Sequence, residues 1–127
     1  MNLKALIVED DLVVQFLNKK LLNSINIEAD IVSNGFEALM QLKKSTYDFV
    51  LMDINMPEQD GLDTARWIRD EQDTVIRAIP IFALTSFATE EHTQEIKDAG
   101  INEHLSKPLS VELLVKILHH YFQVPSL

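Results

Sequence analysis

The feature that most constrains this chain is a regular alternation between short apolar runs and longer segments with helical spacing. Four runs bounded by polar residues cover residues 5–8, 27–32, 49–52 and 79–84, and the run at 27–32 is the weakest. Runs that are apolar at successive positions predict strands covered on both faces, as in a parallel sheet. A short fifth strand is expected at residues 102–105.

Between these runs, apolar residues recur every three or four positions, which predicts amphipathic helices. In the first such segment Val14, Leu17 and Leu21 have the spacing of a core-facing set. Thr89 is expected to cap a fourth helix that ends at Gly100, and a fifth helix follows. Strands and helices that alternate five times predict an α/β fold: a doubly wound, five-stranded parallel sheet with five helices on its two faces.

The chain has the length of one domain, and we expect residues 1–127 to form it, because single scattered glycines and prolines mark no linker. No apolar stretch approaches the roughly 20 residues of a membrane span, and a net charge of −9 opposes nucleic-acid phosphates. We therefore expect no membrane insertion and no direct nucleic-acid contact. The absence of cysteine excludes disulfides and thiol catalysis, and it is compatible with the cytoplasmic location that we expect.

Polar residues follow the predicted strands at the edge where open parallel sheets gather functional groups. Glu9 and Asp10 follow the first strand, Asp53 the third, Thr85 the fourth and Lys107 the fifth. If the first and third strands are neighbours, the three carboxylates converge. Two carboxylates about 5 Å apart repel by about 3 kcal/mol at an effective dielectric constant near 20, so this cluster calls for a cation.

The chemistry of these residues indicates metal-assisted phosphoryl transfer. Oxygen ligands suit magnesium or manganese better than zinc. Lys107 adds a fixed positive charge and Thr85 a hydroxyl donor, which together form a pocket for a tetrahedral anion with one carboxylate as nucleophile. Taken singly, each residue is more often a turn, cap or solvated residue, but their conjunction at four strand ends favours the functional interpretation.

Four motifs in this order resemble the response-regulator receiver domain of two-component signalling, over essentially the whole chain. They are Val8-Glu9-Asp10, Met52-Asp53-Ile54-Asn55-Met56-Pro57 followed by Asp60-Gly61, Ala83-Leu84-Thr85-Ser86, and Leu105-Ser106-Lys107-Pro108. The resemblance implies a flavodoxin-like sheet with strand order 2-1-3-4-5. It also implies a cis bond between Lys107 and Pro108.

The same resemblance implies a role in phosphorelay signal transduction. Asp53 would accept a phosphoryl group from phosphohistidine on a histidine kinase or a histidine-phosphotransfer domain, and Lys107 would bind the phosphoryl oxygens. Magnesium, or manganese, would be held by Glu9, Asp10, Asp53 and the backbone carbonyl of Asn55. The phosphorylated domain would then act on a downstream protein that the sequence does not identify.

The resemblance also implies a switch, in which Thr85 moves toward the phosphoryl group. Family members often carry an aromatic switch residue at the position of His104. An imidazole there is either a pH-sensitive part of the switch or a surface histidine on an edge strand, and both interpretations stay open.

A phosphohistidine donor has to approach Asp53 beside the helix that begins after Asp11. Val13 and Phe16 lie about 100° from the expected core-facing set of that helix, so we expect part of this pair to form a small apolar docking patch. The alternative is that they are simply incompletely buried.

Two other functions remain open. A magnesium-dependent phosphohydrolase with an aspartyl-phosphate intermediate usually has a second aspartate where this chain has Asn55. A phosphorylation-independent binding domain would have lost the acidic pair or the lysine, and this chain has both. We therefore expect a self-dephosphorylating receiver rather than a turnover enzyme. Residues 62–66 and 99–105 resemble receivers of hybrid histidine kinases, so the chain is either a free-standing regulator or part of such a kinase.

Overall fold

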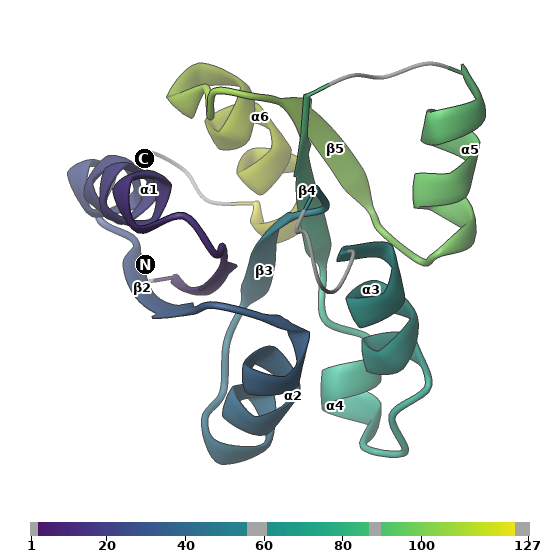
Figure 1. The fold of residues 1–127 in the computed structure, drawn as a ribbon. Helices are drawn as coiled ribbons and strands as arrows, with labels where there is room; N and C mark the ends of the chain where they lie inside the picture. The colour runs from purple at the N-terminus through teal and green to yellow at the C-terminus, as the bar shows by residue number, and fades with distance from the viewer. Residues whose placement is uncertain (1–2, 56–60, 87–89, 124–127) are drawn as a thin grey trace.

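The computed structural model describes residues 3–55, 61–86 and 90–123, so Met56, Pro57, Asp60 and Thr89 lie outside the described residues. Five parallel strands form one sheet in the order β2-β1-β3-β4-β5 (Figure 1). They are β1 (Lys4–Val8), β2 (Glu28–Val32), β3 (Phe49–Asp53), β4 (Ile81–Thr85) and β5 (Glu103–Ser106). The predicted fold class and strand order are confirmed.

Six helices connect the strands or follow them in the described residues. They are α1 (Leu12–Ser24), α2 (Gly35–Lys44), α3 (Gly61–Arg69), α4 (Thr74–Arg77), α5 (Glu90–Asp98) and α6 (Val111–Phe122). Five of them correspond to the predicted helices. The additional helix, α4, is a single turn that begins because the Asp73 carboxylate accepts hydrogen bonds from the backbone N–H groups of Val75 and Ile76.

The two faces of the sheet carry separate hydrophobic cores, because successive strand residues point to opposite faces. On one face, Leu6 and Val8 of β1 belong to a core that also contains residues of α2, α3, α4 and α5. On the other, Ala5 and Ile7 belong to a core with residues of α1 and α6, and Figure 1 shows these two helices on the same side of the sheet. Both faces of the strands are therefore covered, as their continuous apolar runs predict.

The buried face of α1 differs from the predicted one. The structure buries Asn18 and Leu22, whereas Leu17 is 50% exposed and Val14 and Leu21 are only partly buried. The helix is thus rotated by about one residue, or about 100°, from the orientation that its apolar spacing indicates. The buried position of Asn18 carries a polar side chain, so hydrophobic periodicity does not indicate the face of α1 that packs on the sheet.

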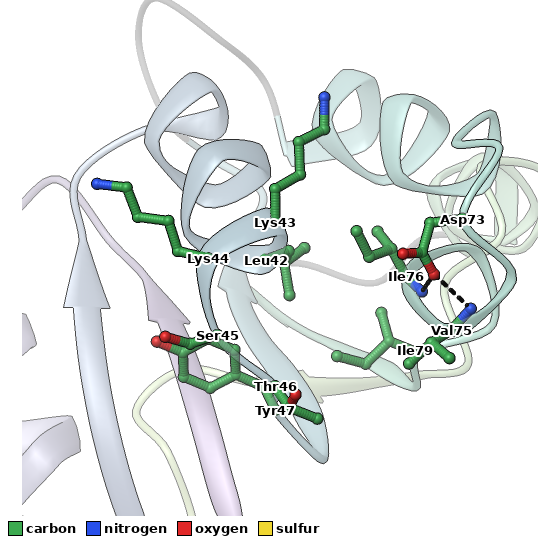
Figure 2. A pocket seen from close by; sticks show the side chains of 10 residues that line it. All are labelled: Leu42, Lys43, Lys44, Ser45, Thr46, Tyr47, Asp73, Val75, Ile76 and Ile79. Carbon is green, nitrogen blue, oxygen red and sulfur yellow. Dashed lines mark hydrogen bonds between the residues drawn. The ribbon is translucent and has the colours of Figure 1, made fainter.

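A pocket of about 260 Å³ lies at the N-terminal edge of the sheet, between α2 and α4 (Figure 2). Leu42, Ile76 and Ile79 contribute its apolar lining, and the capping residue Asp73 borders it. None of the predicted site residues lines this pocket. Among the described helices, none combines the length and apolar character that a bilayer crossing requires.

Candidate functional site

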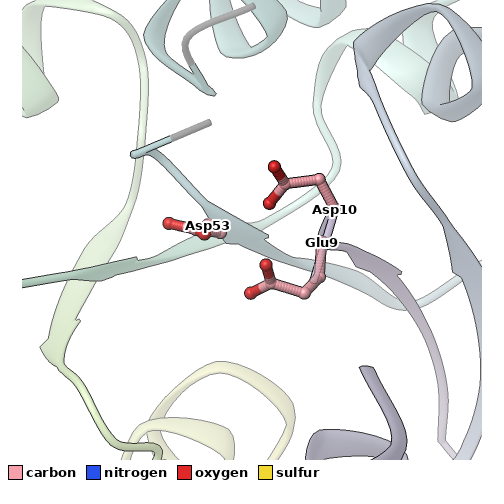
Figure 3. Close-up of side chains that lie close together, drawn as sticks. All are labelled: Glu9, Asp10 and Asp53. Atoms are coloured by element: carbon pink, nitrogen blue, oxygen red, sulfur yellow. The ribbon is translucent and has the colours of Figure 1, made fainter. Parts of the chain in front are cut away.

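Three carboxylates converge at the C-terminal edge of β1 and β3 (Figure 3). One oxygen each from Glu9, Asp10 and Asp53 lies within 4.8 Å of the other two. The pairing of the strands explains this, because Val8 lies opposite Met52, so the next residues, Glu9 and Asp53, lie side by side at this edge. The predicted convergence is confirmed.

Glu9 is the most deeply buried acid of the cluster, with 2% of its surface exposed. Its Oε2 accepts a hydrogen bond from the backbone N–H of Asp11 at 3.1 Å, while its buried Oε1 has no hydrogen-bond partner in the described part of the chain. Burial raises the pKa of Glu9 to about 7; the Asp11 hydrogen bond opposes this shift, and the nearby charge of Asp53 adds to it.

These residues fit a hard divalent cation. The unpartnered Oε1 of Glu9 is a buried acceptor beside two further carboxylates, and a bound cation would satisfy it. Asp10 is exposed, so the cluster opens to solvent on one side, which suits an ion that keeps part of its water shell. Participation of the Asn55 carbonyl stays a prediction.

Asp53 ends β3 and is 4% exposed. Its Oδ1 forms an ion pair with the Nζ of Lys107 at 2.7 Å and accepts a hydrogen bond from the backbone N–H of Asn55 at 2.9 Å. Lys107 follows β5, and its own backbone N–H donates to the carbonyl of Thr85 at 2.9 Å. The Lys107–Pro108 bond is cis, as the resemblance implies. The predicted lysine therefore lies against the predicted phosphoacceptor.

Thr85 ends β4 and is fully buried. Its Oγ1 lies 3.1 Å from Nε2 of His92, which belongs to α5. Next to it, the backbone N–H of Ser86 donates to Oδ1 of Asn55 at 3.3 Å and so links the segments that follow β4 and β3. The sequence analysis did not identify His92, because no motif spacing relates it to Thr85 and only the packing of α5 brings it there.

His104 lies on β5, which is the edge strand of the sheet, and it is partly buried. It pairs with Ala83, so its side chain is on the face of the sheet whose core includes α5. Its role as a switch residue stays a prediction.

The exposed face of α1 lies next to this site. Val13 is 66% exposed and Phe16 is 65% exposed, which confirms the predicted accessibility of the pair. A groove of about 570 Å³ separates α1 from the segment after β5, and its lining includes Leu17, Pro108 and Lys107. Since Lys107 also pairs with Asp53, one lining residue of this groove contacts the carboxylate cluster.

The sheet and this edge together define a class: a flavodoxin-like α/β domain with an acidic cluster and a lysine-paired aspartate at the point where strand order reverses. Comparison with protein families agrees. Residues 5–119 match the model of the response regulator receiver domain, and the chain belongs to this family.

Relatives include a response regulator and a histidine kinase. The chain is 32% identical over 117 residues to the polar-differentiation response regulator DivK of Brucella anthropi, a match that covers 92% of this chain and 94% of DivK. It is 31% identical over 147 residues to the probable histidine kinase 1 of Oryza sativa subsp. indica. That match covers 93% of this chain but 15% of the kinase.

Solved structures show the same fold. The receiver domain of a Pseudomonas aeruginosa sensor histidine kinase superposes with a TM-score of 0.85 at 31% identity, covering 98% of this chain and all of that domain. That structure has a magnesium ion coordinated in the active site cleft. The yeast receiver Ssk1, crystallised with the histidine phosphotransfer protein Ypd1, matches with a TM-score of 0.84 at 25% identity, covering 99% of this chain and 92% of that one.

Proposed function

We propose that this domain accepts a phosphoryl group from phosphohistidine onto Asp53, in the presence of Mg²⁺, and signals through the resulting change of surface. The observation that carries this proposal is the buried Asp53 carboxylate, which lies within 4.8 Å of two further acids and 2.7 Å from the Lys107 ammonium. A relative that is a histidine kinase, and a structural neighbour bound to a histidine phosphotransfer protein, support this class of donor.

Asp53 supplies the nucleophilic oxygen. Because Lys107 and the Asn55 N–H both bind Oδ1, we assign the attack to Oδ2. The bond from phosphorus to the donor's imidazole nitrogen breaks as the bond to Oδ2 forms, and the imidazole leaves with the electron pair. Lys107 would bind the transferred oxygens, and the hydroxyl of Thr85, which follows the residue paired with Asp53, would turn toward them.

Glu9, Asp10 and Asp53 would hold the metal, with the Asn55 carbonyl as a further ligand. Bound Mg²⁺, or Mn²⁺, would neutralise charge on the phosphoryl oxygens during transfer. The unpartnered Oε1 of Glu9 supports this assignment, since that oxygen accepts no hydrogen bond in the described residues. We also propose a cytoplasmic setting, with which the absence of cysteine from the sequence is compatible.

We propose a receiver that loses its phosphoryl group slowly to water, rather than a turnover hydrolase. A hydrolase of the aspartyl-phosphate class needs an acid or base near the nucleophile. The residue two positions after Asp53 is Asn55, whose amide does not transfer protons near neutral pH and whose Oδ1 is bound by the Ser86 N–H. The downstream partner stays unassigned.

The docking surface that we propose for the donor is the exposed face of α1, with Val13 and Phe16, and the groove beside it. The apolar lining would accept apolar side chains of a helical donor. We expect such a donor to lie next to Asp53, because Lys107 both lines the groove and pairs with Asp53.

Intact-protein mass after incubation with Mg²⁺ and phosphoramidate, together with release of inorganic phosphate, tests this function. We expect one added phosphoryl group per chain, none with excess chelator, and slow phosphate release. Rapid catalytic release without a stable adduct would indicate the hydrolase. No adduct under any condition would indicate a binding domain that works without phosphorylation.

A further inference from the structure

A hydrogen bond ties the phosphorylation edge of the sheet to helix α5. It joins Oγ1 of Thr85, at the end of β4, to Nε2 of His92, in the first turn of α5, at 3.1 Å. Thr85 is fully buried and His92 is partly buried, so water competes poorly for either group. The reaction described above does not use His92.

The backbone of Thr85 is fixed independently of this bond. Leu84 pairs with Asp53 of β3, Thr85 pairs with Ser106 of β5, and the Thr85 carbonyl accepts the Lys107 N–H at 2.9 Å. A change in the direction of the Thr85 hydroxyl therefore requires rotation about χ1 between staggered positions, not a shift of the strand. In the present rotamer the hydroxyl lies within hydrogen-bond distance of His92.

Helix α5 has few other deep contacts with the sheet. Ile96 is the one buried side chain among its residues, Glu90–Asp98, and it lies in the second half of the helix. The first turn carries Glu90 and Glu91, which are exposed. The bond from His92 thus joins the end of β4 to a half of α5 in which no side chain is buried, and such weakly buried elements shift most easily.

We propose that His92 is a positioning residue that holds the Thr85 hydroxyl in its unphosphorylated orientation and couples that orientation to α5. This inference rests on the proposed function. Phosphorylation of Asp53 exchanges the hydrogen bond between Thr85 and His92 for one between Thr85 and a phosphoryl oxygen. Loss of the first bond frees the first turn of α5, and the surface of that helix changes as a result.

A bond that exists in only one state shifts the equilibrium between the two states by its net contribution. A typical hydrogen bond contributes enough to change such an equilibrium by about two- to tenfold. Removal of the His92 partner therefore favours the phosphorylated orientation by about that factor. Removal of the His92 partner should leave the equilibrium unchanged in a Thr85→Ala variant, because that variant has no hydroxyl to bond His92.

The test measures binding of beryllofluoride, a stable mimic of the phosphoryl group, by titration calorimetry with saturating Mg²⁺. His92→Phe keeps a ring without the hydrogen bond, and His92→Leu is a second variant that removes it. His92→Gln is the matched control, because its amide can still bond Thr85. We expect about two- to tenfold tighter binding for the Phe and Leu variants, wild-type binding for Gln, and no effect of His92→Phe in a Thr85→Ala background.

Unchanged or weaker binding in both the Phe and Leu variants overturns the inference. So does a Gln variant that matches Phe, or an effect of His92→Phe that persists in the Thr85→Ala background. Thermal melting of each variant identifies any that fails to fold. If the wild-type chain binds no beryllofluoride with Mg²⁺, the proposed function itself fails, and this result is distinct from all of the others.

Discussion

At the scale of single residues, the fold opposes the ionisation of Glu9. Burial is the main reason that its pKa rises from 4.5 to about 7. Between pH 4.5 and about pH 7, Glu9 holds a proton in the folded chain that it has released in the unfolded chain. The unfolded state then binds fewer protons, so the contribution of Glu9 to the free energy of unfolding falls as pH rises through this window.

We therefore predict that the metal-free chain loses up to about 3 kcal/mol of stability through Glu9 between pH 4.5 and pH 7. Urea unfolding with chelator present, compared at the two ends of this window, measures the loss. Glu9→Gln, which cannot ionise, should show a correspondingly smaller pH dependence. A Gln variant with the full wild-type dependence would show that other groups are responsible.

The site residues that sequence reasoning could find are those that follow strands directly. Glu9, Asp53, Thr85 and Lys107 each have a position set by the end of an apolar run, and the parallel sheet then brings these ends together. His92 could not be found in this way, because its contact with Thr85 depends on how α5 lies against β4. Spacing along the chain carries no information about that packing.

At the scale of elements, the helices show where hydrophobic periodicity is a poor guide. The predicted core-facing set of α1 is wrong by about one residue, because the polar residue Asn18 occupies a buried position. The Nδ2 of Asn18 has no hydrogen-bond partner in the described residues. Helix α4 spans only Thr74–Arg77, which is too short to show a period. The strands were predicted to within two residues, since each is a compact block with a polar boundary.

The exposed face of α1 supports a prediction at this scale. Val13→Asp or Phe16→Asp should slow transfer from a phosphorylated histidine-phosphotransfer protein by about tenfold or more, because each places a charge in the proposed apolar contact. Labelling by phosphoramidate should not change, since a small donor needs no docking surface. Stopped-time intact-mass measurements report both rates.

Val75→Asp is the matched control for these variants. Val75 is 69% exposed but lies on α4, where it lines the pocket at the opposite edge of the sheet. Transfer from the protein donor should proceed at the wild-type rate in this variant. Equal slowing of both donors by Val13→Asp would mean that the substitution disturbs the site, and no slowing with either donor would place the interface elsewhere.

At the scale of the whole molecule, the carboxylate cluster and a hydrogen-bond network around Arg69 lie at opposite edges of the sheet. The carboxylates lie at the C-terminal edge, and Arg69 holds the other edge together. Its guanidinium donates to the carbonyls of Gly100, Arg77 and Ile79 and to Oδ1 of Asn102, at 2.7–2.8 Å. Gly100 has φ +89°, and a Cβ there would lie 2.6 Å from Cγ of Arg69, so this contact also requires glycine.

We predict that Arg69→Ala lowers the free energy of unfolding by about 3 kcal/mol, because several carbonyls lose a charged donor. Arg66→Ala is the matched control. Arg66 pairs with Asp63 at 2.9 Å on the surface, where both side chains are about half exposed, so its loss should cost less than about 1 kcal/mol. Urea denaturation measures both values, and equal losses would contradict the role assigned to Arg69.

Peptide mass spectrometry, after treatment of the chain with phosphoramidate and Mg²⁺, locates the phosphoryl group and so tests whether Asp53 is the phosphoacceptor. We predict a single modified site at Asp53, absent from Asp53→Asn and absent when a chelator removes the metal. A phosphoryl group found on another residue of the wild-type chain, or an Asp53→Asn variant labelled as fully as wild type, would contradict it.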